Sequence, residues 1–254
     1  NTTGNDNTAV GYNSGSAITT GEQNTSLGSA TLDANTTGNY NTAIGTSALG
    51  ANTTGSTNTA VGVGALDTNT TGSDNVGVGL NALDDNTTGS SNTAVGRSSL
   101  ANNTTAANNT AVGYYALEAN TTGASNTCLG DSAGSSITTG SHNVLIGRNT
   151  GVDTIALTTG GHNVVLGNFS RTGTADAYYA IGLGYNITAA GGYTTVGRDT
   201  SDIRAAHGVA TWATVSDERY KKDIVDSTAG LSFINALQPR TFKYKTLGEL
   251  PETF

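Results

Sequence analysis

Hydrophobic and polar positions recur along this chain with a period of 17 residues. A short segment that opens on Asn and closes on an aliphatic residue and Gly, as in NTAVG or NVLIG, occurs ten times. Such spacing is typical of a solenoid, because each coil must stack on the previous one in register. Nine of the Asn residues are 17 positions apart, and the tenth follows after 20: Asn7, Asn24, Asn41, Asn58, Asn75, Asn92, Asn109, Asn126, Asn143 and Asn163.

Each coil can be numbered from its Asn as position 0. Position 3 is then always aliphatic and position 4 is always Gly. One aliphatic side chain per coil predicts an inward-facing column on a parallel β-sheet. The Gly that follows predicts a corner with positive φ or a close backbone approach. The aliphatic column consists of Val10, Leu27, Ile44, Val61, Val78, Val95, Val112, Leu129, Ile146 and Leu166.

A second corner is indicated by a recurrent Thr-Thr-Gly motif, which only Ala106 interrupts. Two corners per coil predict two short strands per coil. In the second half, most coils carry Leu at position 8 and Asn at position 11. Two coils instead pair Gly15 with Ile18 and Gly134 with Ile137, so each half-coil keeps one apolar anchor. Stacked Asn side chains are expected to form amide ladders along the array.

The pattern predicts an all-β parallel β-solenoid, or β-roll, over residues 1–200. The aliphatic–Gly pairs Ile181-Gly182 and Val196-Gly197 predict one or two atypical final coils, and 201–215, which include Trp212, form a connecting strand region. Each coil would bury two or three aliphatic side chains, worth about 2 kcal/mol apiece. Ordering its backbone costs about 1–2 kcal/mol per residue. Because this core is thin, we expect the solenoid to pack against copies of itself as a homotrimer.

Composition excludes several partners. The formal net charge is −8, and residues 1–200 hold 4 basic and 12 acidic residues, so nucleic acid and anionic membranes are not expected to bind. No stretch of 18 apolar residues predicts membrane insertion. Cys128 occupies a position filled elsewhere by small or aliphatic residues, which predicts a buried hydrophobe. The chain lacks Met and starts inside a repeat, so we expect a piece of a longer protein.

The repeats resemble the heads of trimeric autotransporter adhesins, which have shorter coils, and the shafts of bacteriophage tail fibres. The segment SDERYKKDI at 216–224 resembles the opening of the intramolecular chaperone domain of phage tailspikes and tail fibres, best known from endosialidases. Leu237, Pro239, Phe242 and Tyr244 fit the L-x-P-x-x-F-x-Y strand of that family. The resemblance implies that 216–254 begin a short α+β chaperone segment.

In that family the domain trimerises the chain, directs folding of the shaft and then cuts itself off. By resemblance, cleavage falls between Ser216 and Asp217, with Ser216 as nucleophile and Lys221 as its base. A partly desolvated Lys can activate a Ser hydroxyl in this way. From the bare residues, Ser216 and Asp217 also fit the N-cap of a helix that starts near Glu218.

Other patterns favour structural roles. The Asn-x-Thr triplets could accept glycans, but an Asn-Thr-Thr-Gly turn explains them without that context. A regular Thr column leaves an ice-binding surface open as a less favoured alternative. The acidic residues do not share one position, so no calcium ladder is expected. His142 and His162 are interpreted as surface turn residues, which a trimer axis could gather into a metal site. Exposed Tyr near the non-repetitive end would be the platform for a glycan.

The sequence therefore predicts a structural and host-attachment protein, the distal part of a trimeric phage tail fibre or spike in the virion. Its expected partners are copies of itself, other tail proteins and a host cell-surface glycan or protein receptor. The alternative is the head of a trimeric adhesin on a bacterial surface. Neither a cofactor nor a bound metal is predicted. The only candidate enzymatic activity is self-cleavage by Ser216 and Lys221.

Overall fold

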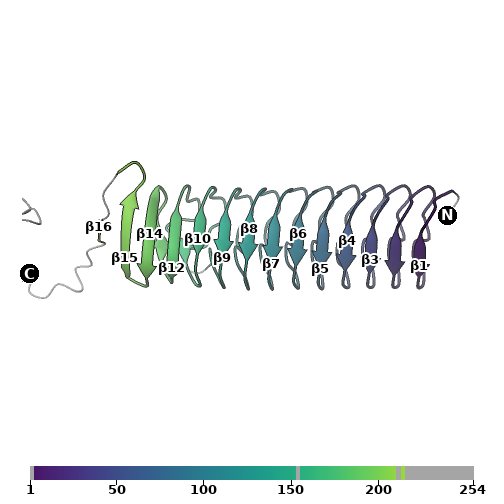
Figure 1. Cartoon of the computed structure of the whole chain (residues 1–254), viewed down its shortest axis with the longest axis horizontal. Helices are drawn as coiled ribbons and strands as arrows, with labels where there is room; N and C mark the ends of the chain where they lie inside the picture. The colour runs from purple at the N-terminus through teal and green to yellow at the C-terminus, as the bar shows by residue number, and fades with distance from the viewer. Residues whose placement is uncertain (1–2, 153–154, 210–212, 215–254) are drawn as a thin grey trace, which may run out of the picture. The chain divides into compact units, whose positions relative to one another are not determined.

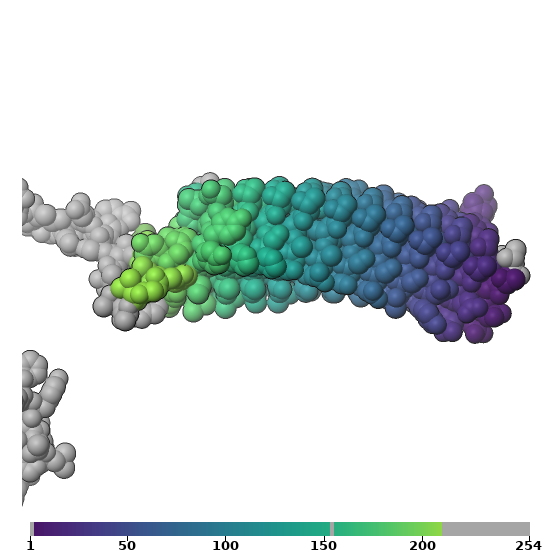
Figure 2. Space-filling model, turned by 90° about the horizontal axis from the view of Figure 1, so that it is seen from above, coloured from purple at the N-terminus to yellow at the C-terminus, as the bar shows by residue number. Residues whose placement is uncertain are grey.

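The computed structural model describes residues 3–152, 155–209 and 213–214, and this part of the chain is all-β without a helix. Ten three-residue strands follow one another along a rod of stacked coils, coloured from purple to green in Figure 1. Figure 2 shows the same coils as one continuous rod. The ten strands are β1 (Thr8–Val10), β2 (Thr25–Leu27), β3 (Thr42–Ile44), β4 (Thr59–Val61), β5 (Val76–Val78), β6 (Thr93–Val95), β7 (Thr110–Val112), β8 (Thr127–Leu129), β9 (Val144–Ile146) and β10 (Val164–Leu166).

The strands form a 14-stranded sheet in which each coil pairs with the next. Strands β1 to β10, β12 (Ile181–Tyr185) and β14 (Tyr193–Arg198) are parallel and in register, for example Thr42 with Thr59. Strands β15 (Ser201–Ala206) and β16 (Ala213–Thr214) are then added antiparallel. The parallel β-solenoid predicted from the 17-residue period is therefore confirmed.

The predicted inward direction of position 3 is wrong. Val10 is 56 % exposed and Leu27 is 48 % exposed, and the later members of the column are exposed or half-exposed. Side chains alternate between the two faces of a strand, so positions 1 and 3 share one face while positions 0 and 2 share the other. The Asn at position 0 faces inward, which turns the aliphatic residue at position 3 outward.

The core is built from small residues at positions 2 and 7 and from Leu at position 8. Ala43, Ala48 and Leu49 of one coil are fully buried, and equivalent residues repeat along the rod. Cys128 takes position 2 in its coil and is a free, fully buried cysteine, as predicted. Burial raises the pKa of its thiol, so the thiolate is disfavoured.

The second predicted strand is absent from the regular coils within the described residues. This half of the coil consists of turns in which positions 6 and 8 adopt left-handed conformations, as at Ser47 (φ 57°) and Leu49 (φ 52°). Only the last coils have a second strand pair, β11 (Arg171–Thr172) with β13 (Thr188–Ala189). The reason is geometric, because alternating left-handed residues cannot extend into a strand.

Two Asn ladders hold the coils together, as the sequence predicted. The Oδ1 of each position-0 Asn accepts the backbone N–H of the next one at 2.9–3.2 Å. Its Nδ2 donates to the carbonyl of the Thr-Thr-Gly corner of its own coil, as in Asn41 to Gly55 at 2.9 Å. Successive position-11 Asn side chains bond to one another at 2.7–3.1 Å, and Asn52 also donates to Gly55 at 2.9 Å. The buried corner carbonyl is thus satisfied by both ladders.

The exchange of Leu and Asn for Gly and Ile is confirmed, and it leaves one buried oxygen without a hydrogen bond. Ile137 is fully buried beside Gly134, whose φ of 63° is the left-handed value that Leu adopts in other coils. With Ile in place of Asn, the position-11 ladder stops. The Oδ1 of Asn120 in the preceding coil is consequently left buried without a hydrogen-bond partner.

Both Gly columns allow close stacking of the coils, and position 4 also requires a positive φ. At position 4 the Gly residues have φ between 126° and 141° in the regular coils, and a Cβ there would strike the next coil's backbone. At the Thr-Thr-Gly corner φ is not positive, but a Cβ on Gly55 would strike the carbonyl of Gly72. Close coil stacking is therefore the requirement that both corners share.

The end of the array differs from the predicted register. Leu183 pairs with Leu166, and Gly184 carries the positive φ of the position-4 corner, so Leu183-Gly184 is the equivalent pair. The predicted pair Ile181-Gly182 was therefore wrong by two residues. Ala180 takes the position of the strand Asn, and its N–H donates to Asn163 Oδ1 at 2.9 Å. The 17-residue period thus resumes after the single 20-residue coil.

Candidate functional site

The outward aliphatic column is the most extensive candidate surface. We call it the aliphatic stripe. It runs along the sheet because the parallel register aligns one member from every coil, and Leu183 and Val196 extend it. Its ten regular members are Val10, Leu27, Ile44, Val61, Val78, Val95, Val112, Leu129, Ile146 and Leu166.

The surroundings of the aliphatic stripe are also uncharged. Position 1, on the same face of each strand, is Thr or Val in β1 to β10, and no charged residue lies in these strands. A contiguous apolar face of this kind is unusual on an isolated soluble chain and marks an interaction surface. Sequence reasoning found these residues but placed them in the core.

A second feature is a stack of flat rings from successive coils, each at the corner that directly precedes the strand of its coil. His142 and His162 lie exposed in bends, as predicted, with ring centroids 4.7 Å apart and planes 12° apart. Tyr179 continues the stack at 5.3 Å from His162. All three adopt left-handed φ values of 58–60°. Within the described residues, no group of three or more His, Cys, Asp or Glu side chains is arranged to hold a metal ion.

The side chains of the Thr column form hydrogen bonds between stacked coils. Thr53 Oγ1 donates to the carbonyl of Thr70 at 3.0 Å, and the same bond repeats along the rod, as in Thr70 to Thr87 at 2.9 Å. The Asn of the Asn-Thr-Thr-Gly turn, such as Asn52, is fully buried. A folded coil therefore cannot present this Asn for glycosylation, which supports the structural explanation of the motif.

The acidic residues as a set do not share one position, but three of the aspartates do. Asp33, Asp67 and Asp84 all occupy position 9 of their coils. Desolvation by burial, together with the neighbouring Asp33, raises the pKa of Asp67. Desolvation, Asp85 and Asp67 raise the pKa of Asp84. The arrangement concentrates negative charge at the expense of stability, and the described part of the chain contains no set of acidic residues suited to a metal.

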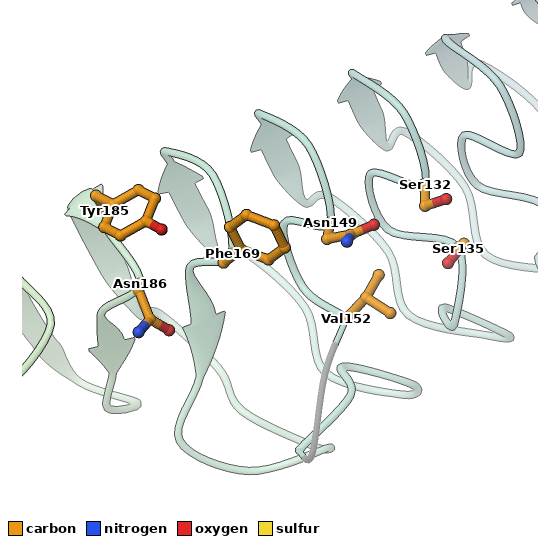
Figure 3. Close-up of a pocket in the computed structure, with 7 residues that line it drawn as sticks. All are labelled: Ser132, Ser135, Asn149, Val152, Phe169, Tyr185 and Asn186. Atoms are coloured by element: carbon orange, nitrogen blue, oxygen red, sulfur yellow. The ribbon is translucent and has the colours of Figure 1, made fainter.

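A groove lies at a corner of the last regular coils, and we call it the corner groove. Figure 3 shows its side chains following successive coils. Its volume is about 470 Å³. The lining residues are Ser132, Ser135, Asn149, Val152, Phe169, Tyr185 and Asn186.

Two aromatic rings form one wall of the corner groove. Phe169 and Tyr185 meet edge to face, with centroids 6.2 Å apart and planes at 81°. The guanidinium of Arg148 lies 5.5 Å from the ring of Phe169, and that of Arg198 lies 5.9 Å from the ring of Tyr185. Sequence reasoning pointed to Tyr near this end but missed Phe169. The signal was a bulky residue at position 6, which is Ala, Ser, Gly or Asn in every earlier coil except that of Tyr115.

The predicted cleavage residues Ser216, Asp217 and Lys221, as well as Trp212, lie outside the described residues. Contacts between residues divide the chain into two units, 1–215 and 216–254. The boundary falls at the residue where the chaperone signature begins.

Residues 216–253 match the family model described as chaperone of endosialidase. This match confirms the resemblance of the C-terminal segment, and it covers a small part of the chain. Neither the curated proteins nor the solved structures contain a match to this chain. Within the described residues, no helix is long and apolar enough to cross a membrane.

Proposed function

We propose that the chain is the distal part of a trimeric phage tail fibre or spike, which serves as a shaft and attaches the virion to its host. The observation that carries the proposal is an uncharged aliphatic stripe along a rigid solenoid that leads into a chaperone-like segment. Partners would be two further copies, other tail proteins and a cell-surface glycan or protein receptor. The adhesin alternative accounts for the rod but not for the match at 216–253.

The aliphatic stripe is the proposed contact between copies. Members that are 36–56 % exposed, such as Ile44 and Val10, still have apolar surface to bury. Full burial of an aliphatic side chain is worth about 1.5–3 kcal/mol, so the remaining half contributes about 1 kcal/mol per residue. Repeated over the coils of three chains, this gain compensates for the thin core within each coil.

The C-terminal segment is proposed to assemble and release the shaft. The amine of Lys221 would take the proton of the Ser216 hydroxyl, and the resulting oxygen nucleophile would attack the peptide carbonyl. The bond to Asp217 would break as its nitrogen takes the proton from Lys221, which leaves the carbonyl of Ser216 in an acyl intermediate. Water would then hydrolyse this intermediate, so that the hydroxyl is regenerated and the released chain ends at the carboxylate of Ser216. Ser216→Ala is expected to abolish cleavage while the trimer persists. Mass spectrometry under denaturing conditions tests this assignment, and a chain ending at residue 216 in the variant would refute it.

The trimer contact can be tested by placing charge on the aliphatic stripe. The double variant Ile44→Asp and Val112→Asp adds two carboxylates at positions that are 36 % and 37 % exposed in the single chain. The matched control, Thr54→Asp and Thr122→Asp, adds the same charge to exposed corners of the same two coils. Sedimentation equilibrium should show monomers for the first variant and trimers for the control. Trimers of both variants would exclude the stripe as the contact.

A further inference from the structure

We propose that the corner groove binds a neutral saccharide unit of a cell-surface glycan. This inference rests on the proposed attachment function and names its ligand and its site. The volume of about 470 Å³ lies within the range of about 300–1,000 Å³ in which proteins hold small molecules. The groove lies where the repeat is modified, because its lining runs from Ser132, in the coil before the 20-residue coil, to Asn186 in the coil of β12.

The lining combines apolar and hydrogen-bonding surfaces without a charged side chain. Phe169 and Tyr185 supply the aromatic wall, on which the C–H faces of a sugar ring can pack. Arg148 and Arg198 lie over these rings, and their charges are paired with Asp131 at 3.6 Å and Asp199 at 3.3 Å. A polyol with an apolar face and a hydroxyl rim matches this mixture of surfaces.

The polar groups of the corner groove differ in how they are held. Asn186 is oriented by Arg171, which donates to its Oδ1 at 3.1 Å, and by Asp199, which accepts from its Nδ2 at 2.9 Å. The side-chain amide of half-buried Asn149 has no hydrogen-bond partner among the described residues. The hydroxyl of Ser135 is likewise unpaired there. The amide of Asn149 and the hydroxyl of Ser135 can therefore donate hydrogen bonds to sugar hydroxyls and accept them.

The charges of the shaft and of the groove lining favour a neutral saccharide over anionic and cationic ligands. The shaft is acidic, so polyanions such as nucleic acid are repelled. No carboxylate lines the corner groove, so cationic ligands lack a counter-ion. A single site of this size would bind weakly, and three sites on one trimer would raise the effective affinity for a multivalent cell surface.

The chain offers a matched control for the aromatic wall. Tyr114 and Tyr185 both occupy position 5 of their coils, and both are 45 % exposed. Each also has a guanidinium over its ring, Arg97 at 5.8 Å for Tyr114 and Arg198 at 5.9 Å for Tyr185. Only Tyr185 lines the corner groove. Tyr185→Ala and Tyr114→Ala therefore differ in the groove but remove equivalent surface rings.

The test is saturation-transfer NMR and titration calorimetry on the full chain with a panel of neutral oligosaccharides containing glucose, galactose and N-acetylhexosamines. The wild type should bind at least one member. Tyr185→Ala and Asn149→Ala should each weaken that binding at least tenfold, and Tyr114→Ala by less than twofold. Equal losses in Tyr185→Ala and Tyr114→Ala, or no binding by the wild type, would overturn the proposal.

Sedimentation of the same samples distinguishes a failure of the saccharide site from a failure of the proposed trimeric fibre. If Tyr185→Ala alters the assembly state instead of sugar binding, the groove is a contact between copies and the saccharide site is wrong. If the wild type is monomeric yet binds sugars in a Tyr185-dependent manner, the trimeric fibre fails while the saccharide site stands.

Discussion

The position-0 Asn ladder can be broken at one coil by Asn58→Ala. Asn58 is fully buried, and its Oδ1 accepts the backbone N–H of Asn75 at 3.0 Å and the Nδ2 of Asn75 at 3.2 Å. Its own Nδ2 donates to Gly72 O at 2.9 Å. That carbonyl keeps a second donor after the substitution, because Asn69 Nδ2 also bonds to it at 3.0 Å. The lasting damage is a buried N–H of Asn75 without an acceptor.

The magnitude follows from these contacts. An orphaned buried donor costs about 1–3 kcal/mol, and the space left by the amide adds about 1 kcal/mol. We therefore expect Asn58→Ala to lower the free energy of unfolding by about 2–4 kcal/mol. Asn102→Ala, which truncates an exposed Asn in a turn of the same rod, should change it by less than about 0.5 kcal/mol.

Urea unfolding followed by circular dichroism measures this difference. All samples should be at one protein concentration, because the stability of an oligomer depends on it. The m-value should stay constant, since the ladder does not change the surface exposed on unfolding. If Asn58→Ala were no more destabilising than Asn102→Ala, the ladder would not hold the coils together and the reasoning would be wrong.

Two further changes probe the corner and the acidic column. Gly55→Ala should destabilise the rod by about 1–3 kcal/mol, because a Cβ there meets the rigid carbonyl of Gly72. Gly50→Ala is the matched control, since the only atom that its Cβ would approach too closely belongs to the movable carboxylate of Asp67, at 2.6 Å, and the thermal midpoint should hardly change. Asp67→Asn should raise the thermal midpoint at pH 7. The folded-state pKa of Asp67 lies above the ordinary value of 3.8, so its penalty is absent below that value and grows as pH rises through the raised pKa. An advantage of the variant that is just as large at pH 3 as at pH 7 would contradict the assignment.

The sequence predicted the architecture because one requirement dominates it. In-register stacking demands Gly wherever backbones approach and Asn wherever a buried carbonyl needs a donor, and these residues recur at fixed positions. The direction of the strand side chains was mispredicted because an invariant aliphatic residue was assumed to be buried. The small residue at position 2, Ala43 or Ala60, was the contrary signal, since a coil that buries Leu at position 8 leaves room only for a small side chain there.

The corner groove was harder to predict for a different reason. Phe169 and Tyr185 are 16 positions apart and fall at different positions of their coils. Only the three-dimensional stacking brings their rings within 6.2 Å of each other. The left-handed turns at positions 6 and 8 were also missed, because Leu49 and its equivalents are not residues that favour positive φ.

The central claim is that the aliphatic stripe joins three copies of this chain. Native mass spectrometry of the wild type, paired with the denatured mass of its chains, tests it most directly. We expect an assembly of three chains, each of 25.5 kDa if intact, or three shorter chains if the bond after Ser216 is cut. A single chain at micromolar concentration would contradict it, because an exposed stripe of this length would then have no partner.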